Sequence, residues 1–336
     1  MRVTVVTISY SKRWDLLRKT LQAALEQGAE RAIVVDNEAD EEIAPRAADA
    51  FGDRVRTLRL EKNRGSAGAY DVGLRAAMAD GAEFLLMLDD DNCLATGSLA
   101  MLLDVYGRLA PDRPRNNLCL LGFRPSHQPE VFQGVTPDPL GNSNDSFLGF
   151  HVKDLHRKIL TRLTVRKRSP PQQAEDPLDR LYRLTIGPFG GMLFHRSVIE
   201  RYGYPDASFV LYLDDTEFTY RITSTGGEVV LVPRARIEDI DQSWNTSAEA
   251  RSTFDRWLLR GSNKQVFYTA RNWSFFQTHR RSHSWMLKVN KLVYMFILWV
   301  LSKRWNKTER FQLMKRAIRD GEQSLMGINP AFPPAK

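Results

Sequence analysis

Cysteine is scarce in this 336-residue sequence, which contains only Cys93 and Cys119. Two thiols do not form the disulfide framework of a small secreted protein, so the sequence predicts a protein of the reducing cytoplasm. The N-terminus also lacks the features of a signal peptide, because the apolar run in "RVTVVTIS" is short and alternates with threonine. We therefore expect a strand at residues 2–9.

Two familiar nucleotide-binding motifs are missing as well. The glycines of "EKNRGSAGAYDVGL", residues 61–74, are not followed by the Gly-Lys-Ser/Thr of a P-loop. No GxGxxG opens a helix after the first predicted strand, which disfavours a dinucleotide-binding fold, and "TISYSKRW" has no glycine there, which counts against a nucleotidyltransferase. The histidines share no metal-ligand spacing, so we interpret all of them as structural or surface residues: His127, His151, His156, His195, His279 and His283.

Long hydrophobic runs are absent too. The unbroken apolar run Leu292–Leu301 has ten residues, or about 15 Å as a helix, which is about half of a bilayer core and too short to cross it. The alternative to a membrane-surface helix is a buried one that packs on the main domain or on a second subunit, so a homo-oligomer stays open. Cationic and tryptophan residues at its flanks are typical of a helix in the plane of a membrane surface: Lys288, Lys291, Lys303, Arg304, Trp285, Trp299 and Trp305.

Acidic residues are almost missing from residues 280–316, which hold ten Lys or Arg and a single acid, Glu309. The formal net charge of the whole chain is +8, so this segment accounts for all of the positive excess. Such a block can bind nucleic acid, but the large apolar residues between its charges favour an anionic membrane surface. We predict no nucleic-acid partner and a peripheral protein at the inner, cytoplasmic face of the cell membrane.

What the sequence does contain is a regular alternation of buried strands with amphipathic helices. This pattern predicts an α/β fold with a mostly parallel sheet and helices on both faces. Ligands of such sheets bind at the carboxyl ends of the strands, where "TISY", "DNEAD" and "LDDDN" place polar side chains. We expect strands at 2–9, 31–38, 54–60 and 83–91, and helices at 12–28, 41–52 and 68–81.

Three consecutive carboxylates, Asp89, Asp90 and Asp91, directly follow the apolar run Phe84–Leu88. Two unit charges about 4 Å apart repel by roughly 4 kcal/mol at an effective dielectric near 20. A solvated turn tolerates this repulsion, whereas a site for a divalent cation uses it. A second acidic cluster, residues 214–217, would also cap a helix well.

The order of "VVTISY", "VVDNEAD", "NRGSAGAYDVGL" and "LDDD" resembles the family 2 glycosyltransferases, which have a GT-A fold. The resemblance continues through residues 188–222 and through "YTARNWSFF", residues 268–276, which is similar to the Tyr-x-x-Arg-Asn element of galactofuranosyl- and rhamnosyltransferase-like members. It implies a GT-A, Rossmann-like catalytic domain at residues 1–245, with an insert at about 124–187. Residues 246–336 would form a C-terminal helical extension associated with membrane or acceptor.

The resemblance also implies which residues bind the nucleotide-sugar donor. Asp36 would hydrogen-bond the nucleoside, and Thr7 would line the same pocket. Asn63 and Gly65 would lie beside the nucleotide-sugar, and Asp90 would point toward the donor sugar.

For the metal, Asp89 and Asp91 match the Asp-x-Asp element that holds Mn²⁺ or Mg²⁺ on the donor diphosphate. Many relatives place a metal-ligating histidine some two dozen residues after the catalytic base, but "VPRARIEDIDQSW" has none here. Asp239 or Asp241 would substitute for it, or water would complete the shell.

On the acceptor side, the resemblance assigns Asp215 as the general base that takes the proton of the acceptor hydroxyl. The further acceptor-side residues would be Asp214, Glu217, Arg221, Gly190 and Gly191. For the two glycines, the alternative to an acceptor-side role is a tight turn before a strand.

Together these features predict an inverting, metal-dependent transferase that moves a sugar to a lipid-linked or cell-envelope glycan, with a glycan or glycolipid as acceptor. The two aspartate motifs look closer to those of galactofuranosyltransferases, which makes UDP-galactofuranose the first choice of donor and dTDP-rhamnose the second. A catalytically inactive, membrane-associated scaffold on the same fold is a further alternative. The basic residues at 153–168 would form an acceptor-side or membrane-facing element, or a solvated helix face.

Overall fold

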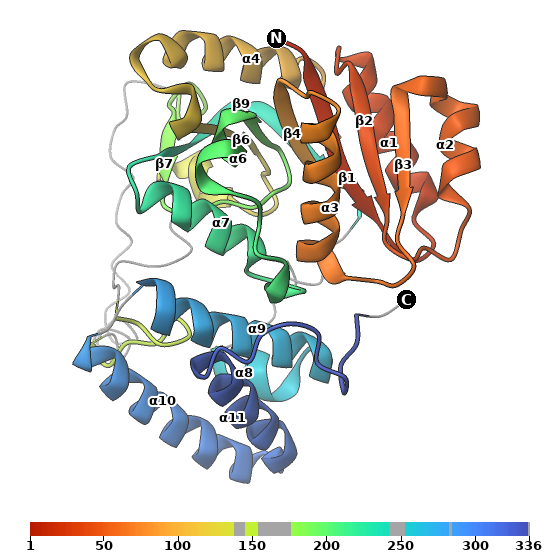
Figure 1. Cartoon of the computed structure of the whole chain (residues 1–336). Coiled ribbons are helices and arrows are strands. Elements are labelled where there is room, and N and C mark those ends of the chain that lie inside the picture. Colours follow the sequence, from red (N-terminus) through yellow and green to blue (C-terminus); the bar gives the residue numbers. More distant parts are fainter. Residues whose placement is uncertain (138–144, 154–175, 242–252, 282–283, 335–336) are drawn as a thin grey trace.

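The computed structural model describes residues 1–137, 145–153, 176–241, 253–281 and 284–334. A twisted sheet with helices around it forms the upper part of the view in Figure 1, and helices α8 to α11 form the lower part. The expected boundary after residue 245 lies outside the described residues. Most of the basic stretch at 153–168 lies outside them as well, and only Lys153 of that stretch is described.

The sheet has the strand order β3-β2-β1-β4-β8-β6-β9-β5, and β7 pairs with β9. Strands β3, β2, β1 and β4 run parallel, whereas β8 is antiparallel to both β4 and β6. The predicted, mostly parallel α/β architecture is therefore confirmed. The strands are β1 (Val3–Ser9), β2 (Arg31–Asp36), β3 (Val55–Arg59), β4 (Phe84–Asp89), β5 (Asn92–Leu94), β6 (Leu118–Phe123), β7 (Tyr182–Leu184), β8 (Met192–His195) and β9 (Glu228–Asp239).

Helices cover both faces of this sheet because successive side chains of each strand point to opposite sides. On β1, Val3 and Val5 join one core with α1, α2 and α4, while Val6 and Ile8 join a second core with α3, α6 and α7. The helices are α1 (Trp14–Glu26), α2 (Ile43–Phe51), α3 (Gly65–Ala79), α4 (Ser98–Leu109), α6 (Ser197–Tyr202) and α7 (Asp214–Thr223). Single turns lie at Gly52–Arg54, Ala110–Asp112, Arg115–Asn117, Pro129–Gln133, Ala207–Phe209 and Gln277–Arg281.

The C-terminal helices are α8 (Thr253–Leu259), α9 (Asn263–Phe276), α10 (Trp285–Arg304) and α11 (Thr308–Glu322). They share a third core, in which Phe267, Tyr294 and Met314 are fully buried. Helix α9 lies between the sheet and the other C-terminal helices (Figure 1). Gly321 allows α11 to pass closely, because a Cβ there would lie 2.1 Å from the carbonyl oxygen of Arg271.

Helix α10 has 20 residues, and an 18-residue stretch of it has a mean hydropathy of 1.3, with 22% of that stretch buried in the protein. By length and composition alone this helix could cross a membrane, which corrects the expectation that the segment is too short.

The predicted start of α3 at residue 68 is corrected to Gly65. Two features mark the start of α3 at Gly65. The side-chain oxygen of Asn63 accepts a hydrogen bond from the Gly65 amide, and Gly65 itself has a positive φ.

Candidate active site

The three aspartates at the end of β4 meet the end of β9 at one edge of the sheet. Strand β5 turns back from them and pairs antiparallel with β9, which places Asn92 opposite Asp239. The Asn92 amide donates to Asp91 Oδ1 at 3.1 Å and to Asp239 Oδ1 at 3.0 Å. Asp89, Asp91 and Asp239, predicted as metal ligands, are thus brought into one cluster, which we call the strand-end cluster together with Asp90.

Arg13 neutralises part of this cluster. Its Nε lies 2.9 Å from both carboxylate oxygens of Asp90, and its two Nη atoms lie 3.0 Å from Asp91 Oδ2 and 2.8 Å from Asp241 Oδ2. Burial raises the pKa of Asp90 to about 7 even though Arg13 opposes the shift. Burial alone would lower the pKa of Arg13, but the Asp90 charge holds it above its usual range.

A second arginine, Arg124, follows β6 and lies against the other end of the cluster. Its Nε donates to Asp239 Oδ1 at 2.8 Å, and its Nη1 lies 3.7 Å from Asp89 Oδ2. His127 Nδ1 lies 3.0 Å from Asp239 Oδ2, and the Ser126 hydroxyl also donates to that oxygen. Burial would raise the pKa of Asp239, but the contacts with His127 and Arg124 hold it well below its usual range.

The donor chemistry of the strand-end cluster fits a hard divalent cation, because its side chains offer carboxylate oxygens. Within the described ranges, however, no three His, Cys, Asp or Glu side chains converge on one point as ligands. Asp89 is held by Tyr70, whose hydroxyl donates to Oδ1 at 2.9 Å. Its Oδ2 faces Gly190, where a Cβ would lie 3.0 Å away and only 2.1 Å from the Asn92 side-chain oxygen. Glycine at this position therefore keeps the approach to Asp89 clear.

The predicted nucleoside contacts lie at the ends of β1 and β2. Asp36 is buried, and its oxygens accept from the Ala39 amide at 2.8 Å and from Arg59 Nη1 at 2.7 Å. The Asp36 carboxylate therefore shapes its own loop and pairs with an arginine that is more than half exposed. The neighbouring Thr7 is fully buried, and its hydroxyl has no hydrogen-bond partner in the described part of the chain.

The segment Asn63–Ser66, which includes the first two residues of α3 and which we call the donor loop after its predicted role, is fixed by side-chain amides. Asn63 Oδ1 accepts from the Gly65 amide at 2.8 Å and from Asn37 Nδ2 at 3.0 Å. Gly65 has φ +72°, and a Cβ there would lie 2.0 Å from the carbonyl oxygen of Val210. Glycine is thus required at position 65 both by the backbone conformation and by the approach of Val210.

A second acidic cluster, Asp214 and Asp215, begins α7. Asp214 Oδ2 accepts from the Ser66 hydroxyl of the donor loop at 3.0 Å, while Asp215 Oδ1 accepts from the Thr216 amide at 2.6 Å. Burial raises the pKa of both carboxyls, and the charge of Asp215 raises that of Asp214 further. This pair, which we call the helix-start pair, thus combines elevated pKa values with a direct link to the donor loop.

Comparison with protein families identifies the family to which the chain belongs. Residues 4–203, more than half of the chain, match the family described as "Glycosyl transferase family 2". The chain belongs to glycosyltransferase family 2.

Solved structures agree with this assignment at the level of the fold. GalNAc-T7, crystallised with UDP, GalNAc and Mn²⁺, matches with a TM-score of 0.52 and 13% identity over 87% of this chain, which spans only 53% of that structure. S. aureus TarS 1–349, crystallised with UDP-GlcNAc, matches with a TM-score of 0.51 and 13% identity, over 96% of this chain and 81% of that one. Among curated proteins, no sequence matches this glycosyltransferase.

Other predicted residues of the glycosyltransferase have mainly structural contacts. Glu217 is buried and pairs with Arg221 at 2.8 Å and with Arg280 at 3.4 Å. Arg221 also donates to backbone carbonyls of Tyr202 and Tyr204. Their acceptor role stays a prediction, and their contacts tie α7 to its surroundings. Gly191, with φ +90° and its amide bonded to the Met87 carbonyl, forms the turn into β8.

Three residues that contact the strand-end cluster, Arg13, Arg124 and His127, were not predicted from the sequence as part of the site. Their signal was available, because both "TISYSKRW" and "GFRPSH" follow apolar strands and therefore lie at the ligand-binding edge of the sheet. The contact of His127 with Asp239 agrees with the interpretation of the histidines as structural or surface residues.

Proposed function

We propose that this enzyme transfers a sugar from a nucleotide donor to a glycan or glycolipid acceptor, with inversion at the anomeric carbon. The observation that carries the proposal is the link between its two acidic clusters. Ser66 of the donor loop bonds Asp214, and burial, with the Asp89 charge in addition, raises the pKa of Asp215. A base beside the donor site is what a single displacement needs.

In this mechanism Asp215 takes the proton of the acceptor hydroxyl, and the acceptor oxygen forms a bond to the anomeric carbon. The bond from that carbon to the donor diphosphate breaks, and the electron pair leaves with the nucleoside diphosphate. Asp214 and Gly190 would lie on the acceptor side, and Asp36, Thr7 and Asn63 on the nucleoside side.

Asp89, Asp91 and Asp239 are the carboxylates that would hold a divalent cation, Mn²⁺ or Mg²⁺, to neutralise the donor diphosphate. Since no three side chains converge as ligands within the described ranges, one or two of these carboxylates would bind it together with the phosphate oxygens. Tyr70 orients Asp89 for this role, and Asn92 holds Asp91 and Asp239 together. GalNAc-T7 is a structural neighbour that was crystallised with Mn²⁺, which supports the choice of cation.

For the donor, the proposal keeps UDP-galactofuranose first and dTDP-rhamnose second. Both structural neighbours were crystallised with a uridine nucleotide, which favours UDP over dTDP. Isothermal titration with UDP and with dTDP, each with and without Mn²⁺, tests the choice. Metal-dependent UDP binding supports a UDP-hexose, and a preference for dTDP supports rhamnose. If neither nucleotide binds, the catalytic proposal is wrong and the inactive scaffold becomes the better explanation.

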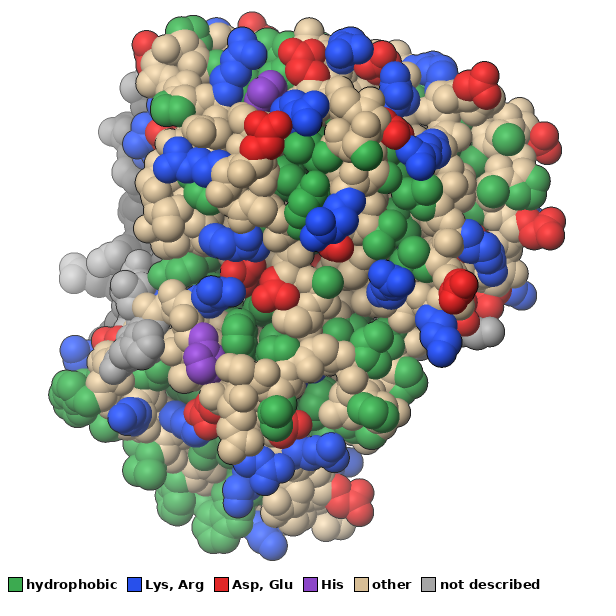
Figure 2. All heavy atoms as spheres, in the orientation of Figure 1, with side chains coloured by type: hydrophobic (Ala, Val, Ile, Leu, Met, Phe, Trp, Pro, Cys, Tyr) green, Lys and Arg blue, Asp and Glu red, His purple; other side chains and the backbone are tan. Residues whose placement is uncertain are grey.

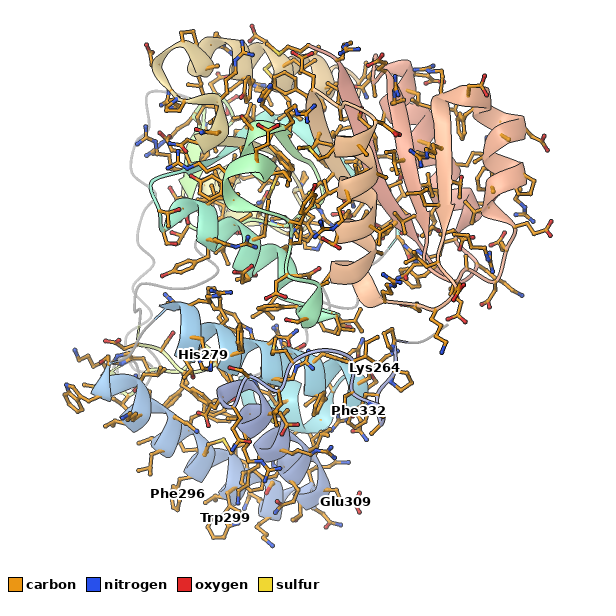
Figure 3. The ribbon with its side chains drawn as sticks, in the orientation of Figure 1. Lys264, His279, Phe296, Trp299, Glu309 and Phe332 are labelled. Carbon is orange, nitrogen blue, oxygen red and sulfur yellow. The ribbon has the colours of Figure 1, made fainter. Side chains whose placement is uncertain are left out.

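We further propose that α10 lies on an anionic membrane at the cytoplasmic face, where it would meet a lipid-linked acceptor. Large apolar side chains lie exposed along one face of α10, including Leu292 at 73% and Phe296 at 62% exposure. Phe296 and Trp299 point away from the other helices in Figure 3, and hydrophobic side chains gather at that lower edge in Figure 2. The exposed Lys288 and Lys303 share this face, which suits anionic lipid.

The opposite face of α10 argues for an in-plane helix and against a spanning one. There Asn290 bonds the Asp145 carbonyl and the Val152 amide, and Lys291 pairs with Glu322. Crossing a bilayer would expose these polar groups to hydrocarbon, which is unfavourable.

Co-sedimentation with phosphatidylglycerol vesicles tests this proposal. A Phe296→Ser/Trp299→Ser variant should bind at least tenfold more weakly, because each aromatic side chain loses roughly 1.5–3 kcal/mol of apolar burial. Leu325→Ser/Ile328→Ser is the matched control, since these apolar residues are equally exposed outside α10. Equal binding by both variants would contradict the assigned face.

A further inference from the structure

The loop that precedes the helix-start pair has an unusual backbone. In the segment Ser208–Leu213, which we call the base loop, Val210, Tyr212 and Leu213 have φ values of +66°, +66° and +62°. None of them is glycine, and the left-handed region is unfavourable for residues with a Cβ, above all for a β-branched one. Such a conformation persists only where surrounding contacts hold it.

Asn272 on α9 supplies contacts of this kind. Its Nδ2 lies 2.9, 2.8 and 2.9 Å from the carbonyl oxygens of Phe209, Leu211 and Tyr212. The side chain is fully buried, so no water competes for these bonds. One amide group therefore contacts the carbonyls on both sides of Val210 and that of Tyr212, and its two N–H groups are shared among the three acceptors.

Arg271 makes further hydrogen bonds to the base loop. Its Nη2 donates to the Phe209 carbonyl at 3.1 Å and lies 3.3 Å from that of Ser208. Its Nε donates to Asn272 Oδ1 at 2.9 Å, which fixes the amide with its NH₂ toward the loop. Its Nη1 donates to the carbonyl of Gly327, whose own amide donates to the Ser208 carbonyl of the base loop at 2.7 Å.

The base loop is held on its other side by α3. The Ala67 amide donates to the Val210 carbonyl at 3.2 Å, and Gly65 leaves room for that carbonyl. Ser66, between them, bonds Asp214. The base loop is thus enclosed between the Arg271–Asn272 pair and the donor loop, and the helix-start pair follows it directly.

We infer that Arg271 and Asn272 are positioning residues that hold the base loop in its strained conformation and so place Asp214 and Asp215 against the donor loop. This gives the Tyr-x-x-Arg-Asn element of α9 a function in the active site, although it lies on a C-terminal helix. The effect on catalysis rests on the proposed role of Asp215. The effect on the conformation of the base loop does not.

The test compares Asn272→Ala with Ser274→Ala. Both are buried polar residues of α9 that bond a carbonyl, but Ser274 bonds Ile318 on α11 rather than the base loop. Hydrogen exchange should become at least tenfold faster in residues 206–218 of Asn272→Ala, with residues 72–78 of α3 unchanged. Ser274→Ala should leave residues 206–218 within twofold of the wild type. Unchanged exchange in Asn272→Ala, or an equal rise in both variants, would overturn the inference.

The catalytic arm measures UDP release from UDP-galactofuranose with water as acceptor. Asn272→Ala should lower kcat at least tenfold while the Kd for UDP stays within threefold, because the donor loop keeps its own contacts. A parallel loss of UDP affinity would indicate general unfolding and count against positioning. Arg271→Lys, which keeps the charge without the planar fork, is the second variant if Asn272→Ala is insoluble. A wild type without turnover contradicts the donor assignment, and the exchange comparison still decides the inference.

Discussion

The two acidic clusters of the candidate active site differ in the groups that compensate their charge. In the strand-end cluster, Arg13 and Arg124 contact the carboxylates. The pKa of Asp239 is held well below its usual range, whereas burial raises that of Asp90 to about 7 despite Arg13. In the helix-start pair, Asp214 and Asp215 accept bonds from a hydroxyl and an amide, and no cationic side chain in the described residues pairs with them. Burial then raises the pKa of both.

The difference shows how one site can separate two tasks by environment alone. A carboxylate whose pKa is held low by its contacts, as that of Asp239 is, stays ionised near neutral pH and suits a fixed electrostatic role. A buried carboxyl with a raised pKa has greater affinity for a proton and suits proton transfer. The following predictions test this division.

The largest expected effect comes from Asp215, the proposed base. Asp215→Asn should lower kcat by about 10²–10⁴-fold, because the amide cannot accept the acceptor proton, while nucleotide binding stays close to wild type. Steady-state kinetics and titration with UDP measure the two quantities. Asp15→Asn is the matched control, since Asp15 is an exposed acid in the first turn of α1. Near-normal turnover of Asp215→Asn would show that the base lies elsewhere.

A smaller effect should appear in the thermal stability at pH 7, where substitutions in the two clusters should shift Tm in opposite directions. Asp239→Asn should lower Tm, since removing one partner of a buried ion pair costs about 3 kcal/mol. Asp214→Asn should raise Tm, because the amide still accepts from Ser66 without the cost of burying a charge. Thermal unfolding of both variants measures the pair. Shifts of the same sign would contradict the proposed division.

The smallest effect is in the pH profile. Because the folded-state pKa of Asp215 is raised, its carboxylate form is lost as pH falls through a value above the ordinary one near 4. The acid limb of kcat/KM should therefore lie above pH 4, with a tenfold fall per unit below the pKa. An acid limb at or below the ordinary value would show that the base is not in a desolvated environment.

The sequence predicted the fold and the position of the strand-end cluster well. Period-two strands and amphipathic helices follow from local patterns, and the carboxyl ends of parallel strands must share an edge. The start of α3 was wrong by three residues, since the helix begins at Gly65. Spacing along the chain also carried no hint that β5 would turn back and pair Asn92 with Asp239.

The side-chain contacts that hold the candidate site could not be predicted from local sequence patterns. Arg13 and Arg124 lie far from their carboxylates in the sequence, and their partners depend on how the sheet closes. The base loop carries no glycine to mark its left-handed residues, so its strain is visible only with Asn272 in place. Tertiary context thus decides the conformation where local propensity argues against it.

The hold of α9 on the base loop also sets an order of events during synthesis. The sheet with its carboxylates leaves the ribosome first, and domains begin to fold from the N-terminal side as they emerge. Until Asn272 and Arg271 arrive, nothing on that side opposes the return of the base loop to ordinary backbone angles. The sheet of the nascent enzyme would therefore fold before the base loop reaches its final conformation. Activity would begin only when the C-terminal helices dock.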